Sequence, residues 1–231
     1  MKDGPDISLI AAMIGDPARA NILMALMSGL SLTAAELARE AAVTPSTVSG
    51  HLSKLEASGL VVSARQGRYR HVRIADHDVA HAIEALVTVA ARAGHMRTRP
   101  GPKDEAMRQA RSCYDHLAGR MAVELFQHWV SSRVLYWRDG VVNLSRKGDH
   151  MLEERGIDMP ALKRMKRPLC RTCIDWSERR HHLGGSIGAA VLSLVVEKRW
   201  AVRDPASRVV DFSSAGAMSF AAWYRSMQPA R

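Results

Sequence analysis

Cysteine, aspartate and histidine recur together at two places in this chain. The stretch "RSCYDHLAG" begins at Arg111, and "CIDWSERRHHLGG" begins at Cys173. Both contain Cys-x-Asp, and both contain His-Leu-x-Gly. A thiolate and an imidazole from each stretch would make a competent tetrahedral ligand set for a transition metal. The repeated combination is therefore the first candidate for chemistry in the sequence.

Three interpretations of this constellation stay open at the level of sequence. In the first, zinc or another transition metal is the cofactor, and its ligands are Cys113, His116, Cys173 and His182. In the second, an organic effector, anionic or aromatic, binds in a pocket lined by Cys113, Asp115, His116, Cys173, Asp175, Trp176, Arg179 and His182. In the third, the cysteines are small buried groups, the carboxylates cap helices or pair with Arg111 and Arg179, and the histidines hydrogen-bond in an interface.

The motif "CRTC" adds a thiol-based variant of these interpretations. It ends at Cys173 and brings in Cys170, which could supply a further thiolate to a metal. With Cys113 it could instead form a redox sensor, because neighbouring arginines favour a reactive thiolate. The sequence does not identify the cofactor.

An internal duplication explains why the combination is written twice. When His116 is aligned with His182, Ser145 meets Ser213 and Gly148 meets Gly216, within about two residues of offset. The repeats are predicted at 106–158 and 168–225, each running helix, strand, turn, strand, helix. In both, the serine is expected to cap the closing helix.

The first ninety residues carry a different pattern, with strong helix-start signals. Asp16 with Pro17 and Thr44 with Pro45 are predicted to open helices. The stretch "LTAAELAREA" contains a Thr-x-x-Glu capping box. Strand-like runs at 60–64 and 69–74 follow, joined by a Gln-Gly turn signal. This order predicts a winged helix-turn-helix.

Short polar side chains and arginines in this region suit contact with DNA. Polar residues at the start of a recognition helix reach base edges and phosphates, and a basic hairpin beside it can clamp the backbone. The residues predicted to contact DNA are Thr44, Ser46, Thr47, Ser49, His51, Lys54, Arg65, Arg68, Arg70 and Arg73.

The stretches "DPARANILMALMSG", "LTAAELAREAAVTPSTVSGHLSKLEASGLV" and "RQGRYRHVRI" resemble the ArsR family of bacterial winged-helix regulators. The resemblance covers about residues 7–93 and implies a homodimeric repressor whose ligand weakens operator binding. Two metal sites are known in that family, and this sequence lacks ligands that each of them requires. The helix before the recognition helix has no cysteine, and the last helix lacks the expected second histidine. The motifs "CYDHLAG" and "CIDWSERRHHLGG" resemble a longer subgroup of such regulators.

Charge and composition complete the predicted organisation. The net charge is +10, and residues 1–94 hold as many acidic as basic residues, so the excess lies in 95–231. We expect a mainly α fold with small β-hairpins, of the α+β class. Residues 1–94 form the DNA-binding and dimerisation domain, 95–105 the linker, and 106–231 a sensing domain of two winged-helix-like units.

The same observations exclude several classes of protein. Nucleotide-binding and hydrolase motifs are absent from the sequence, so an enzyme is not expected. Three cysteines do not indicate a secreted disulfide framework, and the sequence shows neither a signal peptide nor an apolar span. We expect a cytoplasmic protein without membrane association, whose partners are operator DNA, a second copy and an effector. The rival is a non-sensing architectural DNA binder that uses Lys163, Arg164, Lys166 and Arg167.

Overall fold

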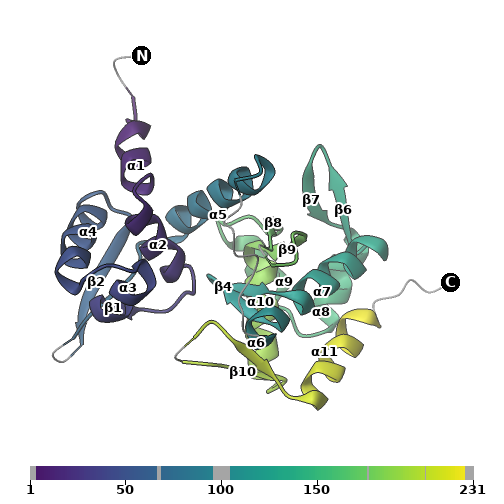
Figure 1. The fold of residues 1–231 in the computed structure, drawn as a ribbon. Coiled ribbons are helices and arrows are strands. Elements are labelled where there is room, and N and C mark those ends of the chain that lie inside the picture. The colour runs from purple at the N-terminus through teal and green to yellow at the C-terminus, as the bar shows by residue number, and fades with distance from the viewer. Residues whose placement is uncertain (1–3, 67–68, 96–104, 176, 206, 227–231) are drawn as a thin grey trace. The chain divides into compact units, whose positions relative to one another are not determined.

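A computed structural model describes residues 4–66, 69–95, 105–175, 177–205 and 207–226 (Figure 1). They form two compact units, Met1–Leu86 and Val87–Arg231. The long helix α5 (His77–Arg92) runs across this division. Most of the predicted linker, residues 96–104, lies outside the described residues.

Local capping signals determine the helices of the first unit. These helices are α1 (Ile7–Ile14), α2 (Pro17–Leu26), α3 (Ala34–Ala41) and α4 (Pro45–Ala57). The carboxylate of Asp16 accepts a hydrogen bond from the backbone N–H of Arg19, and Thr44 accepts one from Thr47. Thr33 and Glu36 form the predicted capping box at the start of α3. The predicted starts of α2, α3 and α4 are therefore confirmed.

A three-stranded antiparallel sheet completes the first unit. Its strands β1 (Leu32–Thr33), β2 (Val61–Gln66) and β3 (Tyr69–Ile74) lie in the order β1-β3-β2. The hairpin β2–β3 is the predicted wing, whereas the two-residue strand β1 was not predicted. The inward side of α4 packs into a core with α2 and α3 through Val48, Leu52 and Leu55. The winged helix-turn-helix predicted from sequence is thus confirmed.

Helix α1 was not predicted, and one buried arginine ties it to α2. The guanidinium of Arg19 donates hydrogen bonds of 2.7 Å to the backbone carbonyls of Ala12 and Met13, at the end of α1. These bonds satisfy carbonyls that have no partner within a helix. No side chain of α1 is itself buried.

The second unit repeats one series of seven elements. The first series is α6 (Glu105–Gln109), β4 (Arg111–Cys113), β5 (His116–Ala118), α7 (Arg120–Ser131), β6 (Leu135–Arg138), β7 (Val141–Leu144) and α8 (Arg146–Glu154). The second series is α9 (Met159–Arg164), β8 (Arg171–Ile174), β9 (His181–Gly184), α10 (Gly185–Glu197), β10 (Ala201–Arg203), β11 (Val210–Phe212) and α11 (Ser214–Arg225). Each series runs helix, hairpin, helix, hairpin, helix, and the two run from teal to yellow in Figure 1.

The prediction for each repeat omitted the opening helix and the first hairpin, and the predicted second repeat, 168–225, begins after α9. That hairpin contains the Cys-x-Asp and His-Leu motif. In the first repeat the chain reverses within two residues, Tyr114 and Asp115, and Tyr114 takes a positive φ of 56°. Tyrosine is an unusual residue for this conformation, so periodicity could not reveal the turn.

Close approach of two backbones explains the glycine that both closing helices carry. Ser145 and Ser213 cap α8 and α11, accepting hydrogen bonds from the N–H groups of Gly148 and Gly216. A Cβ on Gly148 would lie 2.6 Å from the carbonyl oxygen of Val134, and one on Gly216 would lie 1.9 Å from that of Trp200. Only glycine fits at either position, so the same packing has been kept in both repeats.

A helix of each repeat packs on a strand of the other repeat, around one shared core. Helix α7 packs on β9 of the other repeat, and α10 packs on β5. Leu117, Leu183, Ile187 and Val191 are buried in the shared core together with Trp129. This exchange places β5 beside β9, so the two motif hairpins lie side by side.

Among the described residues, no helix is by itself long and apolar enough to cross a membrane. Helices α1 and α2 meet that criterion of length and composition only when they are taken together, across a bend of 88°.

Candidate metal centre and nucleic-acid interface

Each motif hairpin presents one cysteine and one histidine at directly opposed positions. Cys113 pairs with His116 in the β4–β5 register, and Cys173 pairs with His182 in the β8–β9 register. Residues directly opposite one another in an antiparallel pair project from the same face. The loop between the strands is two residues long in the first hairpin and six in the second, which hid this equivalence in the sequence.

The two hairpins bring these four side chains into one cluster, here called the Cys₂His₂ cluster. Its candidate ligand atoms, from Cys113, His116, Cys173 and His182, all lie within 4.8 Å of one another. The Nε2 atoms of the two histidines are 3.2 Å apart. Two nitrogens bound to one tetrahedral zinc at about 2.0–2.1 Å would be separated by roughly 3.3 Å. The cluster therefore fits a tetrahedral metal in both donor type and spacing.

The electrostatics of the cluster favour the protonation states that bind metals. A hydrogen bond with Cys173 lowers the pKa of Cys113 well below its ordinary value, against the effect of burial and with the help of the nearby charge of His116. Burial also lowers the pKa of His182, which favours its neutral form, although the hydrogen bond with Cys113 opposes this. A thiolate and a neutral imidazole are the forms that metals require.

Asp115 lies against the Cys₂His₂ cluster. Its Oδ1 is 3.3 Å from Nδ1 of His116, and both of its oxygens accept hydrogen bonds from the guanidinium of Arg167. Burial opposes ionisation of Asp115, but the hydrogen bonds from His116 and Arg167 prevail and hold its pKa well below the usual range. The group is thus a carboxylate held between an arginine and a candidate ligand.

Asp175 occupies the equivalent sequence position but has other partners. Its Oδ2 accepts hydrogen bonds from Arg111 at 2.8 Å and from the backbone N–H of Gly119 at 2.6 Å. Its Oδ1 accepts three more, from both N–H and O–H of Ser177 and from the N–H of Glu178. Burial opposes its ionisation, but the charges of Arg111 and His182 and these hydrogen bonds bring the pKa of Asp175 to about 2.

The remaining members of the predicted effector site are spread more widely. Arg179 is exposed in the β8–β9 loop with a φ of 56°, and Trp176 lies outside the described residues. Cys170, considered as a further thiolate or a redox cysteine, is half-buried against the core, and burial raises the pKa of its thiol to about 12. The importance of Arg167 to Asp115 was missed, because 52 residues separate the two and no local pattern connects them.

A cavity beneath the two hairpins is too small for an organic molecule. Its volume is about 10 Å³, and its lining is formed by Leu117, Ala122, Leu125, Leu183, Gly188 and Val191. A space of this size is at the lower limit for a single water, and an apolar lining does not favour one. Its lining contains none of the residues predicted to bind an organic effector.

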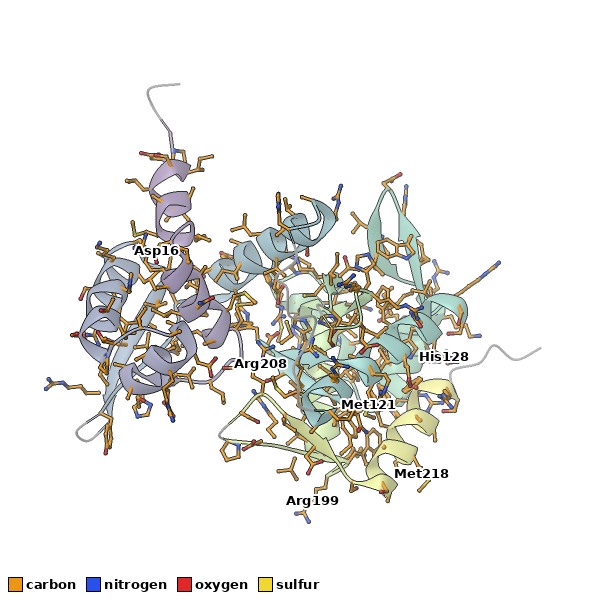
Figure 2. The ribbon with its side chains drawn as sticks, in the orientation of Figure 1. Asp16, Met121, His128, Arg199, Arg208 and Met218 are labelled. Carbon is orange, nitrogen blue, oxygen red and sulfur yellow. The ribbon has the colours of Figure 1, made fainter. Side chains whose placement is uncertain are left out.

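In the first unit, α4 carries most of the polar residues predicted to contact DNA. Ser46, Thr47, Ser49 and Lys54 are exposed along it, and Thr44 is exposed at its N-cap. His51 differs, because it is half-buried with its Nδ1 3.8 Å from the carboxylate of Asp16. Asp16 lies at the start of α2 (Figure 2). The side chain of His51 is thus directed toward the interior of the first unit and not outward, where DNA would bind.

The arginines of the wing also differ in whether they already have hydrogen-bond partners within the protein. Arg65 is exposed on β2. Arg70 pairs with Glu56 and donates to the hydroxyl of Ser63, and Arg73 donates to the backbone carbonyls of Ile74 and Ala75. Arg68 lies outside the described residues.

The basic run considered for a second DNA contact is partly occupied by internal pairs. Lys163 donates to Asp149 at 2.5 Å, and Arg167 is held by Asp115. These two cations therefore already have carboxylate partners within the second unit.

Comparisons with known proteins match both the winged helix and the whole chain. The family described as "Bacterial regulatory protein, arsR family" matches residues 16–63. The chain is 35% identical over 216 residues to the HTH-type transcriptional regulator YdfF of Bacillus subtilis, which covers 94% of this chain and 96% of that protein. It is 37% identical over 83 residues to the HTH-type transcriptional regulator CmtR of Mycobacterium bovis, covering 36% of this chain and 70% of that one.

Among solved structures, the cadmium metal-sensor CMTR of Mycobacterium tuberculosis matches with a TM-score of 0.32 and 37% identity, over 36% of this chain and 85% of that one. Both curated relatives are named as HTH-type transcriptional regulators. Since YdfF is matched over nearly its whole length and the family match falls on the winged helix, the chain belongs to the arsR family of bacterial transcriptional regulators.

Proposed function

We propose that this regulator is a dimeric repressor that binds operator DNA with its first unit and an effector with its second. The exposed polar side chains of α4 would enter the major groove, and the wing would contact the phosphates beside it. Dimerisation is supported by α1, on which Ile7 and Leu9 are 80% and 63% exposed and no side chain is buried. Apolar side chains exposed together indicate a surface that a partner covers.

We further propose that the effector is a transition metal held by the Cys₂His₂ cluster. The observation that carries this proposal is the convergence of four soft or borderline donors within 4.8 Å, contributed by two hairpins of the duplicated fold. Two thiolates and two imidazoles suit zinc and similar tetrahedral ions, and they do not suit magnesium or calcium, which prefer oxygen ligands. An organic effector is less well supported, since both oxygens of Asp175 are already engaged in hydrogen bonds and Arg179 is exposed in the β8–β9 loop.

Operator binding is expected to respond to the metal. Full-length protein should bind its operator at least fivefold more weakly with one equivalent of zinc than after chelation, as is typical of coupling between two sites. The measurement is fluorescence anisotropy with labelled promoter DNA at fixed salt. The variant Cys113→Ser should show no such difference, whereas Cys170→Ser should retain it. Equal affinities with and without zinc in the wild type would refute metal sensing, although the metal site itself could still stand.

Replacement of one wing arginine should weaken DNA binding without changing sequence preference. Arg65→Ala removes an exposed cation, so the dependence of log affinity on log salt concentration should flatten by about one unit. Arg70→Ala serves as the matched comparison, because Glu56 already neutralises that guanidinium. We expect a smaller change in its salt dependence. Equal effects of the two variants would contradict the assignment of Arg65 as the freer phosphate contact.

A thiol-based sensor is the second candidate, and one observation supports it. The sulfur atoms of Cys113 and Cys173 belong to the same 4.8 Å cluster, so in the metal-free protein a two-electron oxidant such as a peroxide would join them in a disulfide, with loss of the two thiol protons. Cys170 is the poorer redox partner, because its raised pKa keeps it a thiol at neutral pH.

A further inference from the structure

The duplication has kept a carboxylate in each motif hairpin, but the two carboxylates contact different parts of the molecule. Asp115 lies beside a candidate ligand, His116, whereas both oxygens of Asp175 are taken up by Arg111, Gly119, Ser177 and Glu178. The difference bears on how the proposed metal centre is held in position. The inference below therefore rests on the proposed metal-binding function.

The contact between Asp115 and His116 determines which nitrogen of the ring faces the cluster. A carboxylate can only accept a hydrogen bond, so Nδ1 of His116, 3.3 Å from Asp115 Oδ1, must carry the proton. In the neutral imidazole, the other ring nitrogen, Nε2, is then free of a proton, and it lies 3.2 Å from Nε2 of His182 within the Cys₂His₂ cluster. This is the tautomer in which His116 can bind a metal through Nε2.

Arg167 holds Asp115 in this position. Its NH2 group donates to Oδ1 at 3.0 Å, and its NH1 group donates to Oδ2, so the pair is bidentate. The residues that follow Arg167 are anchored in turn, since the carbonyls of Pro168 and Leu169 accept hydrogen bonds from Ser186 and Ile187 at the start of α10. The arginine thus links Asp115, in the first repeat, to the segment between α9 and β8 in the second.

The other histidine of the cluster has no comparable support among the described residues. Nδ1 of His182 is buried without a hydrogen-bond partner there, and Asp175 is engaged elsewhere. Of the two candidate histidine ligands, only His116 is therefore oriented by a carboxylate.

We propose that Asp115 and Arg167 are the positioning residues of the metal centre, and that Asp175 belongs to the framework of the fold. Asp115 fixes the tautomer and the ring orientation of His116, and its negative charge makes the imidazole a better donor to a cation. Arg167 keeps the carboxylate in place. Neither residue is among the four proposed ligands.

Cobalt(II) binding to the full-length protein tests this proposal. Co²⁺ takes the same tetrahedral ligands as zinc and is visible by absorption, so its affinity can be measured by competition with a chromophoric chelator. Asp115→Ala should weaken Co²⁺ binding by about 10–100-fold, the usual effect of losing such a partner. Asp115→Asn, which keeps an acceptor but no charge, should fall between this variant and the wild type.

A matched control separates positioning from a general loss of charge. Asp149 is also an aspartate paired with one cation, Lys163, and its side chain is 28% exposed against 26% for Asp115. Asp149→Asn should leave the affinity for Co²⁺ unchanged. Arg167→Lys should retain more affinity than Arg167→Ala, since a single ammonium can still contact the carboxylate.

The tautomer of His116 can be measured without any metal. In ¹⁵N spectra of the chelated protein, the Nδ1-protonated form should dominate in the wild type and lose population in Asp115→Ala, while Asp149→Asn matches the wild type. Co²⁺ affinity of Asp115→Ala within twofold of the wild type, or an unchanged tautomer, would overturn the positioning role while leaving the metal site intact. Failure of the wild type to bind Co²⁺ at all would overturn both proposals.

Discussion

Removal of the metal from the Cys₂His₂ cluster is expected to lower the free energy of unfolding by about 4 kcal/mol. This is the stabilisation that a ligand gives when it binds only the folded protein and its free concentration is about a thousandfold above Kd. For a chain of this size that corresponds to a fall in Tm of roughly 10 °C. The effect should be large because two ligands come from each repeat, so the metal would join hairpins that belong to different halves of the duplication. Metal content per chain and thermal unfolding with and without chelator are the measurements.

Two cysteine variants make this prediction specific. Cys173→Ser should lose the bound metal and show the low Tm even without chelator. Cys170→Ser should keep one metal per chain, because Cys170 does not belong to the cluster. Protein that is purified without chelator, contains no transition metal and shows three free thiols after denaturation would contradict the metal-site proposal.

The second large effect is expected from the buried pair of Arg111 and Asp175. Arg111→Ala should lower the free energy of unfolding by about 3–5 kcal/mol, because it leaves a buried carboxylate without its counter-charge. The side chains are 1% and 0% exposed, and the N–O distance is 2.8 Å. Chemical denaturation of the chelated protein measures the loss without a contribution from metal.

Arg120→Ala is the control for this variant. Arg120 also pairs with a carboxylate, that of Glu105, but both side chains are largely exposed, so the loss should stay below about 1 kcal/mol. Similar losses in the two variants would show that burial does not set the strength of the Arg111–Asp175 pair.

The pH dependence of the same pair follows from the lowered pKa of Asp175. A carboxyl whose pKa is about 2 in the folded state and 3.8 in the unfolded chain binds fewer protons when folded, so its stabilisation is complete above pH 3.8. That stabilisation is lost as the pH falls toward 2. The stability difference between the wild type and Arg111→Ala should therefore narrow below about pH 4.

The winged helix could be predicted in detail because its signals are local. Asp16 with Pro17, the capping box of Thr33 and Glu36, and Thr44 with Pro45 each act within three residues, and each starts a helix where expected. The strand β1 escaped prediction, because its two residues are strand only through pairing with Val72 and His71. That pairing joins segments about forty residues apart, and no local pattern encodes it.

The candidate metal site, too, was only partly predictable from the sequence. The sequence already contained the four ligand types and the duplication that relates them. It did not reveal that each Cys–His pair lies across a hairpin, since this depends on a left-handed Tyr114 and on loops of unequal length. Nor did it show that His51, Arg70 and Arg73 are engaged by neighbours in the first unit.

By itself, then, the sequence determined the family, the winged helix and the chemical types that gather in the second unit, because these depend on residue identity and on spacings of a few positions. The tertiary structure alone decided how those types are arranged. Packing of α7 on β9 and of α10 on β5 brings together side chains some sixty residues apart, and it assigns Asp175 to Arg111 and Asp115 to Arg167. Burial and charge compensation in the folded core determine which residues pair at such separations. Pairing of this kind produces no periodic pattern in the sequence.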